Sequence, residues 1–257
     1  MPRSSSASRS AFLIVGAAFT VVAIAYGVMV VISLLSSQST TERATYPGEI
    51  RHVVLDVAGD VRISGVDAAE TTVERRLRWS LNRPRVTESV EGDTLVISSR
   101  CGFSFAIGCR SDFLIRVPRQ AGIDADSSAD DVLVTGLAGD VVVGSSAGDV
   151  EVRDLDGRLT LKSSAGEVRG TDLRSAEVDA KSSAGDVHLQ FAKAPLSVDA
   201  DSSAGDVRIL LPNGVETYRI NADSSAGDVF TDVRTDPRST RTLKLRSSAG
   251  DVNVAYQ

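Results

Sequence analysis

The sequence predicts an all-β protein, a parallel β-solenoid (β-helix) of about seven regular coils with an irregular β-rich N-terminal cap, preceded by one transmembrane helix. Three observations predict this fold: a hexapeptide that recurs about every 20 residues, apolar–polar alternation on both sides of each copy, and an uncharged apolar segment near the N-terminus. A fixed period of this length is typical of solenoids, in which one coil cannot bury its apolar face alone and stacks on its neighbours.

The apolar segment comes first along the chain. Residues 1–10 carry two arginines, and the 25 residues of 11–35 carry no charge. A segment of this length spans a bilayer as a helix, and the preceding positive charges favour a cytoplasmic N-terminus. We therefore expect 1–10 in the cytoplasm, 11–35 in the cell membrane as a single pass, and the C-terminal domain outside the cytoplasm. A cleaved signal peptide is the alternative, although its apolar core is shorter, about 7–15 residues.

Residues 36–47 are polar and are predicted to form a linker. Residues 48–123 contain less regular alternation and are predicted to be a β-rich capping region. This region holds the two cysteines of the chain, Cys101 and Cys109. A disulfide between them would pin a short apolar loop and implies an oxidising, extracytoplasmic setting. Two free thiols are the alternative, and a metal site would need further ligands that the sequence does not place nearby.

The hexapeptide Ser-Ser-Ala-Gly-Asp-Val defines residues 124–257, which we predict to be the solenoid repeats. Its copies, including the variants SSADDV and SSAGEV, begin at Ser127, Ser145, Ser163, Ser182, Ser202, Ser224 and Ser247. Each copy ends in a Val that opens one alternating strand, and a second alternating strand precedes it. Each coil therefore holds two short strands joined by a tight corner, where we expect glycine to supply a positive φ.

Stacking the copies places like residues above one another. The acidic position forms a column of like charges, which requires screening by solvent or cations. This column consists of Asp131, Asp149, Glu167, Asp186, Asp206, Asp228 and Asp251. The later coils gain extra residues in the other connection, at 192–195, 211–214 and 235–240, and these loops fall on one edge of the rod. They mark either a binding edge or a surface where insertions are tolerated.

A second group of acidic residues is the candidate metal site. Asp179, Asp199, Asp201 and Asp223 flank inward residues on three coils that are adjacent in sequence. Clustered carboxylates of this kind suit a hard cation such as Ca²⁺. Neutralisation by the neighbouring Lys162 and Lys181 is the competing interpretation. We expect no other cofactor.

Enzymatic motifs are missing from the sequence, which contains no GxSxG, P-loop, HExxH or CxxC pattern. His188, with Arg169 and Arg208 on the neighbouring coils, is interpreted as part of a solvated strand face rather than as an acid–base cluster. The net charge of −6 and pI of about 5.0 disfavour nucleic-acid binding, which requires a basic surface. We therefore predict that the protein is not an enzyme, and an enzyme acting on surface polysaccharide is the least favoured function.

The membrane segment, the paired cysteines before FLIRVP (113–118) and the GDVxV…GxVxVxSSAGDV repeats occur together. With them, residues 50–257 resemble the bacterial β-strand-repeat family of unknown function labelled "putative adhesin". The resemblance implies a parallel β-solenoid at the cell surface and supplies no catalytic residues. Some members of the family resemble accessory proteins of envelope-stress signalling.

These observations favour a membrane-anchored, extracytoplasmic, non-enzymatic β-solenoid that acts in surface interaction or adhesion-like binding. The alternative is an accessory subunit that modulates an envelope-stress sensing system. The expected partner is an unidentified protein or cell-envelope component. End-to-end self-association is a further expectation, because the sequence stops at Gln257, six residues after Asp251, without an evident cap.

Overall fold

The computed structural model describes residues 19–21, 23, 24, 26, 27, 38–80, 82–102 and 109–257. The predicted cytoplasmic segment 1–10 and most of the predicted membrane segment 11–35 lie outside the described residues. Those described between 19 and 27 have helical backbone. Within the described part of the chain, no helix combines the length and apolar character needed to cross a membrane.

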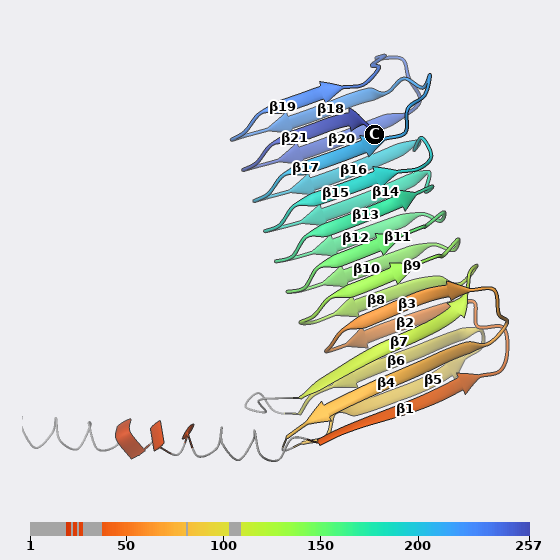
Figure 1. The fold of residues 1–257 in the computed structure, drawn as a ribbon, viewed down its shortest axis with the longest axis vertical. Coiled ribbons are helices and arrows are strands. Elements are labelled where there is room, and N and C mark those ends of the chain that lie inside the picture. The colour runs from red at the N-terminus through yellow and green to blue at the C-terminus, as the bar shows by residue number, and fades with distance from the viewer. Residues whose placement is uncertain (1–18, 22, 25, 28–37, 81, 103–108) are drawn as a thin grey trace, which may run out of the picture.

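Two β-sheets face each other across one apolar core and build a two-sided stack (Figure 1). In the described residues the first sheet runs in the order β1 (Gln38–Tyr46), β4 (Thr71–Trp79), β7 (Arg110–Pro118), β3 (Val61–Val66), β9 (Val132–Thr135), β11 (Val150–Arg153), β13 (Val168–Leu173), β15 (Val187–Phe191), β17 (Val207–Leu211), β21 (Val252–Tyr256) and β19 (Val229–Asp232). The second sheet runs in the order β18 (Arg219–Ser224), β20 (Thr242–Ser247), β16 (Ser197–Ser202), β14 (Glu177–Ser182), β12 (Leu159–Ser163), β10 (Val141–Ser145), β8 (Gly122–Ser127), β2 (His52–Val57), β6 (Thr94–Arg100) and β5 (Arg85–Glu91).

Equivalent strands of successive coils pair in parallel and in register. Val141 lies opposite Leu159, and Ser145 lies opposite Ser163. In the facing sheet, Val150 lies opposite Val168. The all-β class and the parallel stacking of the repeats are therefore confirmed.

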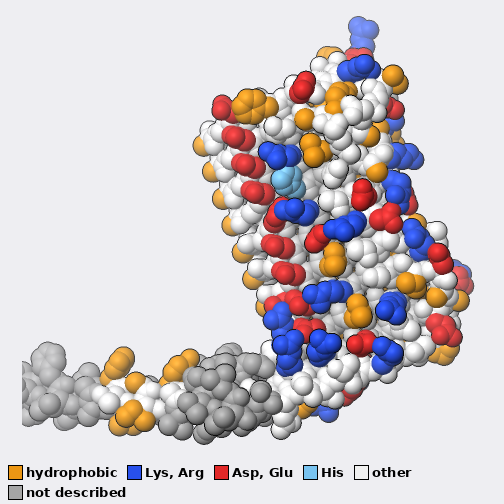
Figure 2. All heavy atoms as spheres, viewed as in Figure 1, with side chains coloured by type: hydrophobic (Ala, Val, Ile, Leu, Met, Phe, Trp, Pro, Cys, Tyr) orange, Lys and Arg blue, Asp and Glu red, His pale blue; other side chains and the backbone are white. Residues whose placement is uncertain are grey.

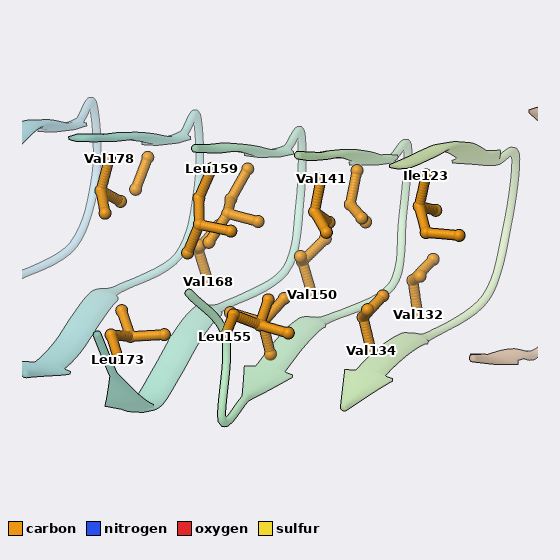
Figure 3. Packing of buried hydrophobic residues seen from close by; sticks show 14 of the residues in the cluster. Ile123, Val132, Val134, Val141, Val150, Leu155, Leu159, Val168, Leu173 and Val178 are labelled. Atoms are coloured by element: carbon orange, nitrogen blue, oxygen red, sulfur yellow. The ribbon is translucent and has the colours of Figure 1, made fainter. Parts of the chain in front are cut away.

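The core lies between the two sheets. The inward valines and leucines of both sheets, such as Val150, Leu159 and Val168, are completely buried and belong to one continuous cluster (Figure 3). Burial of such a side chain stabilises the fold by about 1.5–3 kcal/mol. The period-2 pattern of the sequence thus becomes a column of apolar side chains along the length of the stack.

The first serine of each hexapeptide joins two coils, and it is buried in every copy except the outermost, where Ser224 is partly exposed. Ser163 Oγ donates a hydrogen bond of 3.0 Å to the Gly148 carbonyl oxygen of the preceding coil, and it accepts the Gly166 N–H at 2.9 Å. Equivalent bonds to the neighbouring corner are donated by Ser127, Ser145, Ser182, Ser202, Ser224 and Ser247. Since an unmade bond at a buried polar group costs about 1–3 kcal/mol, the hydroxyl stabilises each hexapeptide corner, whereas the β2–β3 coil has Val57 at this position.

The glycine of the hexapeptide is required by the closeness of the corners. A Cβ at Gly166 would lie 2.3 Å from the Gly148 carbonyl oxygen, and one at Gly185 would lie 2.4 Å from the Gly166 carbonyl oxygen. The expectation that these glycines supply a positive φ is wrong for most copies. Among the hexapeptide glycines the structure gives a positive φ only at Gly250, where it is 152°.

The N-terminal part differs from its prediction in two ways. The predicted linker 36–47 is instead largely strand β1, which pairs antiparallel with β4. The regular stack begins at His52 rather than at 124, because β2 and β3 pair in parallel with β8 and β9. The remaining cap consists of the antiparallel strands β1, β4 and β5, which close this end of the stack.

The last two coils stack in reverse of their sequence order. Strands β20 and β21 lie between the β16–β17 coil and the β18–β19 coil (Figure 1). The tail is fixed there by a 2.9 Å hydrogen bond from the Gln257 N–H to the Leu211 carbonyl oxygen. This order explains the longer connections at 211–214 and 235–240. The first runs from β17 past the β20–β21 coil to β18, and the second runs from β19 back to β20.

The corner geometry predicts the effect of adding one methyl group. Replacing Gly166 with Ala should lower the free energy of unfolding by about 1–3 kcal/mol, because the Cβ would overlap the Gly148 carbonyl oxygen. Denaturant titration followed by circular dichroism measures the change. The matched control is Gly102→Ala, whose Cβ meets nothing within 4 Å. Equal stability of the two variants would contradict this account of the corner.

Candidate functional site

An acidic column runs along the hexapeptide corner and forms a continuous stripe down one edge of the molecule (Figure 2, red). Each aspartate in it except the outermost, Asp228, holds the main chain of the next coil: Asp131 Oδ1 accepts the Asp149 N–H at 2.9 Å, and Asp149 Oδ1 accepts the Glu167 N–H at 2.8 Å. Beyond Asp186 the ladder continues, in the spatial order of the coils, through Asp206, Asp251 and Asp228. The predicted column exists, and its like charges are partly offset by main-chain dipoles.

The ladder changes at Glu167, whose longer side chain turns away. Its carboxylate accepts a 2.6 Å hydrogen bond from Arg169 and lies 3.5 Å from His188 Nδ1. His188 lies between Arg169 and Arg208 in the strand pairing, as predicted. Glu167 was not foreseen as part of this group. The arrangement is a half-exposed ion-pair cluster on a strand face, consistent with the interpretation as a solvated surface.

The predicted cation site is divided between separate ion pairs. Asp179 Oδ1 lies 2.9 Å from Lys181 Nζ, and the hydrogen bond between these side chains raises the pKa of the Lys181 ammonium. Asp199 Oδ2 lies 2.8 Å from Lys244 Nζ. These lysines neutralise two of the four carboxylates.

The other two carboxylates are kept apart by the inserted coil. Arg246 of β20 lies between Asp201 and Asp223 in the strand pairing and is 3.6 Å from Asp201 Oδ2. No group of three or more potential metal ligands occurs in the described part of the chain. The expectation that Asp223 joins the other three is therefore wrong, because sequence order is not spatial order here.

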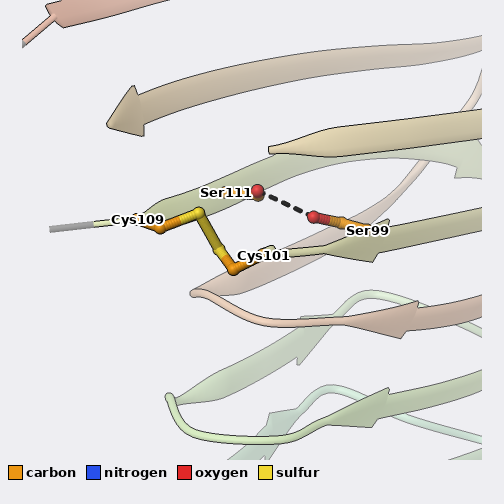
Figure 4. Close-up of a disulfide and its surroundings, with 4 residues drawn as sticks. All are labelled: Ser99, Cys101, Cys109 and Ser111. Carbon is orange, nitrogen blue, oxygen red and sulfur yellow. Dashed lines mark hydrogen bonds between the residues drawn. A yellow bond between two sulfur atoms is a disulfide. The ribbon is translucent and has the colours of Figure 1, made fainter. Parts of the chain in front are cut away.

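The predicted disulfide joins Cys101 and Cys109 (Figure 4). It closes the corner of the β6–β7 coil, at the place that the hexapeptide occupies in the later coils. Beside it, Ser99 Oγ donates a 2.7 Å hydrogen bond to Ser111 Oγ. The loop residues 103–108 lie outside the described residues.

Arg110 follows the disulfide and pairs with three carboxylates beside the start of the acidic column. Its guanidinium contacts Asp60 at 2.9 Å, Asp112 at 2.8 Å and Asp130 at 2.9 Å. Burial raises the pKa of Asp130 despite this neighbouring cation. The group joins β7 to two corners of the stack and is a structural brace.

The end formed by β18 and β19 is open. Val229 is 43% exposed, whereas Val207 and Val252, at the same position in the neighbouring coils, are completely buried. In the coils beneath it, the equivalent valine N–H donates to the main-chain carbonyl oxygen of the acidic residue in the next coil. The Val252 N–H, for example, donates to the Asp228 carbonyl oxygen at 2.9 Å. In the described structure no coil follows to accept the Val229 N–H.

A hollow of about 430 Å³ lies at this open end and is lined by residues that include Tyr218, Ile220, Val229 and Pro237. Tyr218 is buried, its hydroxyl has no hydrogen-bond partner in the described residues, and burial raises its pKa. Nearby, Phe230 is 53% exposed. Unpaired strand edges with an apolar interior are suited to pairing with another strand.

The sequence indicated an uncapped end but placed it at the wrong coil. The C-terminal coil β20–β21 is covered, and β18–β19 takes the outer position. The only signal in the sequence is the extra length of the connections on either side of β18–β19.

The repeats, the corner ladder and the capping strands belong to one continuous stack, and the Toastrack DUF4097 family matches residues 58–257 of it. The chain belongs to the Toastrack DUF4097 family. The Toastrack match begins within the first corner of the stack and extends to the C-terminal coil. The resemblance to a bacterial family of unknown function is thereby confirmed.

Solved structures of similar shape share little sequence with this Toastrack protein. They include a "putative adhesin" from Bacteroides fragilis, 17% identical, covering 85% of this chain and 97% of that one with a TM-score of 0.47. A "putative cell adhesion protein" from Clostridium sporogenes is 11% identical and covers 86% of this chain and 100% of that one, with a TM-score of 0.41. A "putative lipid binding protein" from Parabacteroides distasonis is 13% identical and covers 84% of this chain and 96% of that one, with a TM-score of 0.43. No curated protein matches the sequence.

The acidic ladder predicts that one substitution stabilises the protein. Glu167→Asp shortens the side chain so that it can accept the Asp186 N–H, as aspartates do in the other coils, and should raise the free energy of unfolding by about 0.5–1.5 kcal/mol. Asp206→Ala, which removes the acceptor of the Asp251 N–H, should lower it by about 1–3 kcal/mol. Denaturant titration at neutral pH measures both. A destabilised Glu167→Asp protein would show that its bond to Arg169 matters more than the ladder.

The disulfide predicts a moderate, redox-dependent change in stability. Closing a loop of this length restricts the unfolded chain by about 2–3 kcal/mol, so the variant with both Cys101→Ser and Cys109→Ser should unfold at correspondingly lower denaturant. Reduction should shift the unreplaced protein to the same midpoint and leave the double variant unchanged. If reduction leaves the unreplaced protein unshifted, the disulfide does not contribute to its stability.

Proposed function

We propose that this Toastrack protein is a non-enzymatic surface protein that acts by adhesion-like binding. Residues 11–35 hold it in the cell membrane as a single pass, residues 1–10 lie in the cytoplasm, and the two-sheet stack lies outside the cytoplasm.

The observation that carries this proposal is the placement of the two ends of the stack. Strand β1, which continues directly from the apolar segment, is the outermost strand at one end, and β18 and β19 are outermost at the other (Figure 1). Eleven strands at about 4.8 Å spacing give a rod about 50 Å long. The stack would therefore carry its open end away from the membrane that holds the N-terminus.

Two further features support the extracytoplasmic location. The disulfide between Cys101 and Cys109 persists in oxidising compartments and is rare in the cytoplasm. The uncharged length of 11–35 matches the thickness of a bilayer. Because the sequence also contains none of the common catalytic motifs, binding rather than turnover is the function that these features favour.

The location is tested with the full-length chain carrying one tag before Met1 and another after Gln257. Protease added to bacterial cells stripped of their outer layers, with the cell membrane intact, should remove the C-terminal tag and leave the N-terminal tag protected. Permeabilised cells serve as the control, in which both tags are lost. A C-terminal tag that survives until permeabilisation, or a C-terminal domain released from the membrane, would contradict the proposal.

A further inference from the structure

We propose that the open end binds the open end of a second copy of this chain, by antiparallel pairing of β18 with β18 of the second copy. The inference rests on the proposed function and names the partner of that surface. Three observations carry it: the outward main-chain groups of β18, two unpaired charges of opposite sign on its outer face, and the position of the open end relative to the N-terminal segment.

The main-chain groups of β18 that face away from the stack lack partners. The Arg219 N–H donates to the Arg241 carbonyl oxygen, and the Ser225 N–H donates to the Ser247 carbonyl oxygen. The main-chain groups of the odd-numbered residues in this strand therefore point toward β20. Because N–H and C=O groups alternate in direction along a strand, those of Ile220, Ala222 and Ser224 point off the end. An added antiparallel strand satisfies such groups.

The charges on β18 match those of its own antiparallel copy. Arg219, Asn221 and Asp223 lie on the outer face of the strand and are exposed. Neither Arg219 nor Asp223 forms an ion pair with any described residue, whereas Asp179 and Asp199 in the same sheet are each paired with a lysine. With Asn221 opposite Asn221 of the second copy, the Arg219 of each copy lies opposite the Asp223 of the other.

This pairing also specifies one register. Centring the pair one residue away, on Ile220 or Ala222, removes both contacts between unlike charges. Oppositely charged cross-strand pairs contribute about 0.2–1 kcal/mol each. The same register places Ile220 of one copy opposite Ala222 of the other, and both residues are only partly buried in a single copy.

A second copy fits this end better through its own open end than through its opposite end. The opposite end is closed by antiparallel β1, and β1 continues into the segment proposed to lie in the membrane. A two-fold contact between identical surfaces also closes after two copies. Since the two membrane segments then lie at opposite ends of a rod about 100 Å long, the pair would join two separate membranes.

The first test is a site-specific disulfide cross-link. Full-length chains carrying Asn221→Cys are displayed on two populations of bacterial cells stripped of their outer layers, with a different tag on each, and the cells are mixed and oxidised gently. Residues opposite each other at such a position have Cα atoms about 4.5–5.5 Å apart, within reach of a disulfide. We expect a cross-linked product that contains both tags. The matched control is Thr160→Cys, at the same position in the internal strand β12, which should give none.

The second test exchanges the two charges. Arg219→Glu or Asp223→Arg alone places like charges opposite each other and should weaken formation of mixed cell clusters about ten-fold or more. The variant carrying both exchanges restores unlike pairs and should recover clustering. Lys162→Glu, on the outer face of β12, is the control for a charge change away from the contact and should cluster like the unchanged protein.

The outcomes separate the two proposals. If the protease test places the stack outside the cytoplasm but Asn221→Cys cross-links no better than Thr160→Cys, self-association at β18 is wrong and the surface location stands. Cross-links found only between copies on one cell would overturn the joining of two membranes. Failure of the double charge exchange to recover clustering would overturn the antiparallel register.

Discussion

The close approach of successive corners is the constraint on which the rest of the structure depends. Main-chain hydrogen bonding in both sheets sets the distance between coils at about 4.8 Å, and the corner must keep the same distance. At Gly166 this leaves no room for a Cβ beside the Gly148 carbonyl oxygen, which instead accepts the Ser163 hydroxyl. Glycine and serine thus bring both sheets into the same register, and the valines and leucines of the core follow from it.

The same constraint makes the coils interchangeable. Ser247 and Ser224 donate equivalent bonds to the corners before them, although their coils stack in reverse of sequence order. Because one corner fits against any other, the order of coils is decided by the connections between them. Around β18–β19 the longer connections allow the β20–β21 coil to enter the stack next to β16–β17.

The repeat was sufficient to predict two strands per coil, parallel stacking and the acidic column, because each depends on a local pattern repeated in register. The predicted cation cluster failed at Asp223, since β20 and its Arg246 separate β18 from β16. Strand β1 was missed because Gln38–Tyr46 lacks apolar alternation. It is held by its pairing with β4 and by ion pairs such as Glu42 with Arg75, 2.6 Å apart, which no periodic pattern reveals.

The reversed order of the last coils has a consequence for biosynthesis. In the described structure β18 and β19 pair with no strands except β20 and β21, which are translated after them. After β17, the next two strands of a nascent chain have no final neighbour until β20 and β21 have left the ribosome. The outermost layer of the molecule is therefore completed only after a coil that is synthesised later has taken its place beneath it.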